Sequence, residues 1–333
     1  MPNEALLRVQ DMVKQFPIKQ TLFEIIARKP VQYVRAVDHV SFDVERGETL
    51  GLVGESGCGK STLAKTLSRL YTPDGGKVLF EDREIAAMTP HELQTARRKM
   101  QMIFQDPYSS LNPRMTVRQM MYEVLTVHKV CARAEREKAS LRLLDLVGMD
   151  AGALDRYPSQ FSGGQPQRIS IARALITSPE LLIADEPVSA LDVSIQAQVI
   201  NLLIELKQTL NLTMIFISHD LRVVRYLSDR VIVMYLGAIV ETGPTEPLFD
   251  RPYHPYTDIL MKAAPEVDPV SKGREYAIEG ETPSPLHIPA GCRFHPRCPY
   301  AQEVCRTQEP ELREVEPGRC VACHFRLGGQ TGR

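Results

Sequence analysis

The sequence predicts an α/β fold in which helices pack on a mainly parallel β-sheet. Three apolar segments of strand length, LLIADE, MIFISHD and VIVMYLG, follow one another in the second half of the chain, with helical patterns between them. Another apolar strand is expected at residues 48–53, where it runs into a glycine-rich turn, and a helix is expected from residue 60 to about 70. Residues from roughly 88 to 175 are rich in helical patterns, which predict a helical subdomain set into the α/β core.

The two ends of the chain differ from this core. Residues 1–50 contain short alternating segments, which predict an antiparallel β N-terminal subdomain, and residues 17–34 look like an inserted loop or short helix. Past about residue 250 prolines become frequent and periodicity fades. We therefore predict one domain over 1–260, with its helical subdomain at about 106–175, and a small Cys-rich C-terminal extension over 261–333.

Bulk composition narrows the class of protein. The chain has 333 residues, 43% of them hydrophobic, and a formal net charge of −1, so we expect no nucleic-acid partner. No apolar run approaches the roughly 20 residues that cross a bilayer, and the N-terminus lacks the pattern of a secretory signal. We expect the chain to stay in the cytoplasm, with any membrane role arising from docking onto another protein.

The glycine-rich turn carries the chemistry of a phosphate-binding loop. Residues 54–61 fit G-x-x-x-x-G-K-[ST], and the turn stands between a predicted strand and a predicted helix. Backbone N–H groups and the helix N-terminus favour phosphate oxygens, the lysine reaches the outer phosphates, and the serine hydroxyl ligates Mg²⁺. These predicted ATP-binding residues are Gly54, Glu55, Ser56, Gly57, Cys58, Gly59, Lys60, Ser61 and Thr62.

A pair of acids ends the strand LLIADE. Paired carboxylates at a strand end are a weak signal alone, but downstream of a complete phosphate loop they are typical of an ATPase. We predict that Asp185 holds Mg²⁺, directly or through water, and that Glu186 acts as the general base on the attacking water.

The segment FSGGQ lies about twenty residues before these acids. With it, the chain resembles the ABC ATPases, whose signature reads [LF]SGGQ. The resemblance implies that Ser162, Gly163, Gly164 and Gln165 bind the γ-phosphate of an ATP held by the opposite subunit. One departure follows the signature: Pro166 replaces a long polar residue. Because proline suits a first helical turn, we expect the fold to tolerate it.

The same resemblance implies roles for four further residues. Gln105, in IFQDP, matches the glutamine that touches Mg²⁺ and the attacking water, and Asp192, in SALD, matches the loop that crosses the dimer seam. His219, in ISHD, matches the histidine that contacts the γ-phosphate. Phe16 is our choice for the aromatic ring that stacks on adenine, with Tyr33 as its rival and core packing as the alternative. Since each ATP is then held between two subunits, we expect this chain alone to hydrolyse ATP poorly.

Other segments are similar to the dipeptide and oligopeptide importer ATPases. These are QDPYSSLNPR, ADEPVSALDVS, HPYT and the tail sequence GCRF. The resemblance implies coupling of ATP hydrolysis to peptide uptake, on the cytoplasmic face of the inner membrane. It also implies a second homologous ATPase in a heterodimer, two transmembrane permease subunits and an extracytoplasmic peptide-binding protein. Nickel, sugar or opine importers share this branch and stay open. A soluble ABC ATPase is the rival class, but its usual second ATPase module or long coiled coil is absent.

Five of the seven cysteines lie between residues 292 and 323. Clustered cysteines in a reducing compartment are more typical of a metal or iron–sulfur site than of disulfides. The final C-x-x-C suits zinc, an unmetallated tail stays open, and the other spacings are wider than in most zinc sites. The resemblance implies a 4Fe–4S cluster bound by Cys292, Cys298, Cys305 and Cys323, which leaves Cys320 as a spare thiol.

Overall fold

The computed structural model describes residues 5–189, 191–263 and 283–327, which group into two compact units. Unit 1 takes its residues from Met1–Arg8, Asp43–Thr49 and Leu79–Ser218, and unit 2 takes Val9–Phe42, Leu50–Val78 and His219–Arg333. Both units are therefore discontinuous in sequence. The domain division predicted near residue 260 stays a prediction, and residues 264–282 beyond it lie outside the described part of the chain.

Three parallel strands form the centre of unit 1. They are β6 (Met100–Ile103), β7 (Leu181–Asp185) and β8 (Thr213–Ile217), with Ile183 of β7 opposite both Met102 of β6 and Ile215 of β8. Every residue of β7 and β8 is buried, as expected for parallel strands covered on both faces. The strands predicted at LLIADE and MIFISHD are thus confirmed. A two-residue strand, β5 (Arg83–Glu84), pairs antiparallel with the last two residues of β4 (Gly75–Phe80).

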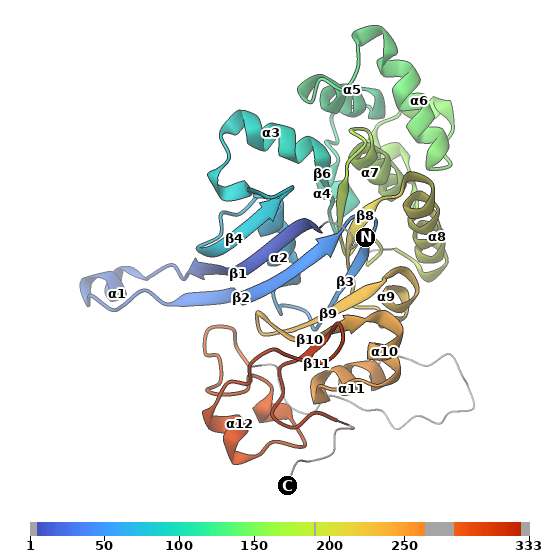
Figure 1. Cartoon of the computed structure of the whole chain (residues 1–333). Coiled ribbons are helices and arrows are strands. Elements are labelled where there is room, and N and C mark those ends of the chain that lie inside the picture. The colour runs from blue at the N-terminus through green and yellow to red at the C-terminus, as the bar shows by residue number, and fades with distance from the viewer. Residues whose placement is uncertain (1–4, 190, 264–282, 328–333) are drawn as a thin grey trace. The chain divides into compact units, whose positions relative to one another are not determined.

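Helices surround these strands, and sequence signals explain where several of them begin. The helix α3 (Pro90–Lys99) starts with a capping box, in which the Thr89 hydroxyl accepts the Glu92 N–H and the Glu92 carboxylate accepts the Thr89 N–H. A second capping box, from Thr116 and Gln119, starts α5 (Val117–Val127). The other helices of unit 1 are α4 (Pro107–Ser110), α6 (Arg136–Leu146), α7 (Gln165–Leu175), α8 (Val193–Leu210) and the 3₁₀ turns η1 (Ile85–Ala87), η2 (Arg133–Glu135), η3 (Ala151–Asp155) and η4 (Pro158–Gln160). Figure 1 shows α5, α6 and α7 packed on one another.

Unit 2 is built on a second set of strands. The strand β3 (Thr49–Val53) pairs in parallel with β9 (Arg230–Tyr235), and β9 pairs antiparallel with β10 (Ala238–Pro244). This confirms the strands predicted at residues 48–53 and at VIVMYLG. The helices are α2 (Lys60–Leu67), α9 (Leu221–Leu227), α10 (Thr245–Asp250), α11 (Pro255–Lys262), α12 (Glu303–Thr307) and the 3₁₀ turn η5 (His295–Arg297).

A separate sheet is formed by strands whose residues belong partly to unit 1 and partly to unit 2. Its strands β1 (Ala5–Pro17), β2 (Tyr33–Glu45) and β4 (Gly75–Phe80) lie in the order β2-β1-β4. Between β1 and β2 the chain forms the short helix α1 (Leu22–Ile26), at the far end of the β1–β2 ribbon in Figure 1. A short helix was one of the two forms expected for residues 17–34.

Two strands that the sequence analysis missed come from the C-terminal region. The strand β12 (Arg319–Val321) pairs with β10, with Val321 opposite Glu241, and β11 (Arg313–Glu316) pairs with β12. Both strands are short and carry no alternating apolar pattern, so their sequence gives little strand signal. They extend the sheet of unit 2 beyond β10.

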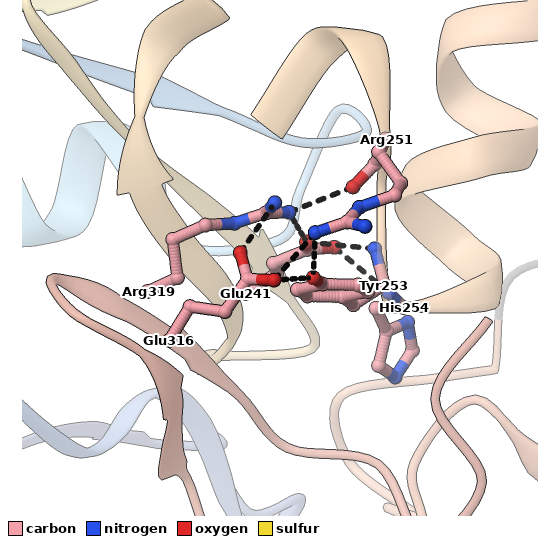
Figure 2. A network of polar contacts seen from close by, with 6 residues as sticks. All are labelled: Glu241, Arg251, Tyr253, His254, Glu316 and Arg319. Carbon is pink, nitrogen blue, oxygen red and sulfur yellow. Dashed lines mark hydrogen bonds and ion pairs between the residues drawn. The ribbon is translucent and has the colours of Figure 1, made fainter. Parts of the chain in front are cut away.

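A buried polar network attaches β12 to the core of unit 2 (Figure 2). The Glu241 carboxylate accepts the backbone N–H groups of Tyr253 and His254, each at 2.8 Å, and lies 3.3 Å from the Arg319 guanidinium. Arg319 also donates to the backbone carbonyl of Arg251 at 2.7 Å. Burial raises the pKa of Glu241. The donors named above partly offset this rise, because they favour the carboxylate form.

Candidate functional site

The phosphate-binding loop of unit 2 adopts a backbone that requires glycine at two positions. Gly54 has φ +151° and Gly59 has φ +111°, both in the region that disfavours other residues. A Cβ at Gly54 would lie 2.3 Å from the carbonyl oxygen of Met234, and one at Gly59 would lie 2.0 Å from that of Ala36. Neighbouring backbone therefore leaves no room for a side chain at either position.

Lys60 is buried at the first residue of α2. Its Nζ donates to the carbonyl oxygens of Gly54 and Glu55, at 2.7 and 2.9 Å, so the lysine spans the curve of its own loop. The loop backbone turns into α2 at Gly59, whose carbonyl accepts the N–H of Leu63 at 2.8 Å. Ser61 and Thr62 occupy the first turn of this helix. The strand–loop–helix order expected for a phosphate loop is confirmed.

Two residues that sequence reasoning left without a role support this loop. The Tyr256 hydroxyl accepts the N–H of Glu55 at 2.8 Å, and the Arg297 guanidinium pairs with both carboxylate oxygens of Glu55, at 2.8 and 3.0 Å. Tyr256 belongs to the segment HPYT, whose family resemblance alone does not predict this contact. Nothing in the spacing of Arg297 signals its contact, because 242 residues separate it from Glu55.

Unit 1 holds the predicted acids at the end of β7. Asp185 is buried, and Glu186 follows in the left-handed region at φ +47°, where its N–H donates to the Ile217 carbonyl at 3.0 Å. The Gln105 Nε2 donates to Glu186 Oε2 at 2.9 Å. Two of the predicted catalytic side chains are therefore in direct contact. A non-glycine residue with positive φ is strained, and such strain concentrates at functional sites.

The FSGGQ segment of unit 1 forms the turn that leads into α7. Ser162 and Gly163 are exposed, and Gly163 has φ +56°. A Cβ at Gly164 would lie 2.4 Å from Cγ2 of Ile195 on α8, so a side chain there would force Ile195 to shift. Pro166 stands in the first turn of α7, as expected, where the missing N–H costs no helical hydrogen bond. Asp192 is exposed at the N-terminus of α8.

Three predicted ligand contacts lie in unit 2. His219 is exposed in the residues that follow β8. Phe16 is half-buried and packs edge-on against Tyr71, with ring centroids 5.2 Å apart. Tyr33 is 44% exposed and lines a cavity of about 510 Å³ with Arg35 and residues 285–288. Their roles toward a nucleotide stay predictions.

The predicted iron–sulfur site depends on where its four cysteines lie. Cys292, Cys298, Cys305 and Cys323 do line one cavity, and Cys320 does not, but the space measures about 10 Å³, room for roughly one water-sized sphere. Within the described residues, no three His, Cys, Asp or Glu side chains are placed to hold a metal ion. Burial raises the pKa of Cys298 to about 11 and that of Cys323 to about 12. The donor types fit a cluster, and the cluster itself stays a prediction.

Comparison with known proteins decides the family. Residues 37–189 match the model described as ABC transporter, and residues 240–305 match the model described as oligopeptide/dipeptide transporter, C-terminal region. A probable peptide ABC transporter ATP-binding protein of Sinorhizobium fredii is 52% identical over 97% of this chain and 91% of its own. The chain is a member of the oligopeptide/dipeptide family of ABC transporter ATP-binding proteins.

Further relatives span the same length. The oligopeptide transport ATP-binding protein AppF of Bacillus subtilis is 50% identical, over 97% of this chain and 98% of its own. The di/tripeptide transport ATP-binding protein DppF of Pseudomonas aeruginosa is 45% identical, over 96% of this chain and 98% of its own. As a member of this family, the chain is an ABC-type ATPase.

Solved structures confirm the ABC ATPase fold. The dimeric post-hydrolysis structure of the ATP-binding cassette MJ0796, bound to ADP and phosphate, matches with a TM-score of 0.62 and 26% identity, over 72% of this chain and 99% of its own. The cbiO1 structure from Clostridium perfringens matches with a TM-score of 0.62 and 25% identity, over 74% and 91%. No helix among the described residues has the length and apolar character needed to cross a membrane.

Proposed function

We propose that this chain is the ATP-hydrolysing subunit of an ABC importer, which couples ATP hydrolysis to the uptake of di- and oligopeptides. The observation that carries the proposal is the extent of the similarity. Relatives named for oligopeptide and di/tripeptide transport match 96–97% of the chain, and the oligopeptide/dipeptide model matches its C-terminal region. A family resemblance confined to the ATPase core would leave the transported solute open.

In the proposed reaction, the loop of unit 2 binds Mg²⁺–ATP as substrate. Lys60 exchanges its two backbone carbonyl partners for phosphate oxygens, and the N–H groups at the start of α2 face the same charge. The Ser61 hydroxyl, Gln105 and Asp185 are proposed ligands of the Mg²⁺ that arrives with ATP. Phe16 is proposed to stack on the adenine.

Glu186 is proposed to take the proton of the attacking water. The Gln105 amide, 2.9 Å from the Glu186 carboxylate, orients this carboxylate and the water. His219 is proposed to contact the γ-phosphate. The Ser162 hydroxyl and the bare backbone of Gly163 and Gly164 are proposed to bind the γ-phosphate of an ATP held by a partner subunit, with Gln165 and Asp192 near the dimer seam.

The complex we propose contains a second homologous ATPase, two transmembrane permease subunits and an extracytoplasmic peptide-binding protein. The chain then lies peripherally on the cytoplasmic face of the membrane. The dimeric form of the MJ0796 cassette supports pairing of two ATPase subunits, and the names of the relatives support a transporter.

Affinity purification from detergent-solubilised membranes of the native host tests this assembly. We expect two multispanning permeases and a second ATPase to be recovered with the tagged chain and identified by mass spectrometry. Recovery of ribosomal or DNA-repair proteins without a membrane protein would contradict the importer and favour a soluble ABC ATPase.

Uptake assays test the solute. Deletion of the gene is expected to abolish accumulation of labelled di- or tripeptides, and a plasmid copy is expected to restore it while a Lys60→Ala copy does not. Normal peptide uptake, together with lost uptake of nickel, a sugar or an opine, would transfer the assignment to that solute.

We also propose that Cys292, Cys298, Cys305 and Cys323 bind an iron–sulfur cluster. The support is that four thiols distant in sequence line one cavity. Protein purified without oxygen is expected to be brown and to contain iron and sulfide. Cys298→Ser is expected to lose the iron, whereas Cys320→Ser keeps it. Colourless, iron-free wild-type protein would remove the proposal.

A further inference from the structure

The C-terminal region reaches the phosphate-binding loop through one side chain. Arg297, in the short turn η5, places Nη1 2.8 Å from Oε2 of Glu55 and Nη2 3.0 Å from Oε1, which is a two-bond pairing of guanidinium and carboxylate. The Arg297 side chain is 5% exposed and that of Glu55 is 18% exposed. The pair is therefore largely shielded from water. Charge interactions are screened least in such shielded positions.

Packing on both sides fixes this geometry. Arg297 Nη1 also donates to the Tyr235 hydroxyl at 3.3 Å, and the Tyr235 ring packs against Tyr256 and Phe294, with centroids 4.7 and 5.3 Å apart. All three rings are buried. Tyr256 in turn accepts the N–H of Glu55. Both the backbone and the side chain of Glu55 are thus held from outside the loop.

The charge of Glu55 explains why such a contact matters to a nucleotide. A carboxylate one residue after Gly54 adds negative charge to a loop that binds phosphates, and like charges in a shielded site repel strongly. A guanidinium paired through both oxygens cancels that charge and points the carboxylate at Arg297. Lys would supply the charge but not the planar two-bond geometry.

We propose that Arg297 is a positioning residue of the phosphate-binding loop, which raises the affinity of the loop for nucleotide by neutralising Glu55 and holding its carboxylate. The inference rests on the proposed role of the loop in binding ATP. It gives the C-terminal region a part in nucleotide binding in addition to any structural or cluster-binding part.

A double-mutant cycle on the full-length chain tests this. Equilibrium binding of Mg²⁺–ADP is measured by calorimetry, because ADP avoids hydrolysis during the titration. Arg297→Gln is expected to weaken ADP binding about tenfold, since it leaves Glu55 unneutralised. The pair Glu55→Gln with Arg297→Gln removes both charges and is expected to return affinity to within about threefold of wild type. Arg297→Lys is expected to lie between wild type and Arg297→Gln.

Two controls separate charge from folding. Arg293→Gln removes another buried ion pair of the same region, 2.8 Å from Asp38, without touching the loop, and is expected to change ADP affinity less than about threefold. The loss of ADP affinity in Arg297→Gln is expected to be smaller at 0.5 M salt than at 0.05 M salt. The screening lengths at these concentrations are about 4 and 14 Å, respectively. Circular dichroism at the assay temperature confirms that each variant is folded.

Three results would overturn the inference: unchanged affinity in Arg297→Gln, no recovery in the double variant, or an equal loss in Arg293→Gln. Each would mean that the ion pair only anchors the C-terminal region. Lys60→Ala tests the proposed loop separately. If wild type and Lys60→Ala bind ADP equally, the role of the loop fails, whereas if only Lys60→Ala weakens binding, the loop stands and the role of Arg297 fails.

Discussion

Single atoms decide the shape of the phosphate-binding loop. Gly57 and Gly59 both have positive φ, at +78° and +111°, but a Cβ at Gly57 meets nothing within 4 Å, whereas one at Gly59 meets the Ala36 carbonyl oxygen at 2.0 Å. The two glycines therefore form a matched pair. A side chain at Gly57 would introduce backbone strain alone. A side chain at Gly59 would introduce the same strain and would also clash with the backbone of Ala36, which has no flexible end that could move away.

Gly59→Ala is expected to abolish detectable ADP binding, because the loop has to shift to clear Ala36. Gly57→Ala is expected to cost only about 1–2 kcal/mol of folding stability, the price of the left-handed conformation, and to retain binding. Calorimetric titration of both variants checks this. Equal binding by the two would show that the close approach at Gly59 has no influence on the loop.

Glu186→Gln is expected to lower the rate of phosphate release in the assembled transporter by about 10²–10⁴-fold, the usual contribution of a general base. The glutamine keeps the shape of the side chain and a polar partner for Gln105, so ATP binding is expected to persist. Phosphate release and ATP binding are measured on the same preparation. Hydrolysis at the wild-type rate would show that Glu186 is not the base.

Among the elements, β10 and β12 show how a terminal region is attached to a core. Their pairing alone sets two residues of β12 opposite β10, Val321 opposite Glu241 and Cys320 opposite Thr242, and the buried contact between Glu241 and Arg319 adds the charge-assisted part. Their side chains are 1% and 4% exposed. Such a pair stabilises the folded state little compared with apolar residues in its place. Removing one partner, however, leaves the other charge buried without compensation.

Arg319→Met is expected to lower the free energy of unfolding by about 3–5 kcal/mol, because Glu241 then stays buried without its cation. Adding Glu241→Gln is expected to recover only part of this loss, since the amide is uncharged but its NH2 group cannot accept one of the two backbone N–H groups that the carboxylate holds. Urea unfolding followed by circular dichroism measures both. No recovery in the double variant would mean that the lost stacking of Arg319 on Tyr253, 4.0 Å from the ring centroid, dominates.

The elements predicted well are those with local signals. A threonine cap three residues before Glu92 and the buried run of β7 are readable in the sequence, because caps and apolar periodicity act over a few residues. The strands β11 and β12 lack such a signal. They form because β12 pairs with the edge of β10 and because Arg319 binds Glu241, which lies 78 residues earlier in the chain.

For the whole molecule, the exposed FSGGQ turn predicts dependence on a partner. Ser162 and Gly163 are exposed in this chain, as residues of a shared ATP site have to be before assembly. The isolated chain is expected to hydrolyse ATP slowly, with a rate per molecule that rises with protein concentration or on addition of the partner ATPase. Steady-state phosphate release over a range of concentrations checks this. A fast rate that is independent of concentration would contradict a shared site.

The family, the α/β fold and the predicted phosphate loop and paired acids could be read from the amino-acid sequence, because they depend on residue types at short, regular spacing. The tertiary structure alone decided which distant side chains meet: Gln105 with Glu186, Arg319 with Glu241, and Arg297 with Glu55. It also showed that four cysteines line one cavity while leaving about 10 Å³ between them. Such contacts follow from how strands pair and rings pack across hundreds of residues, and no local pattern in the chain encodes them.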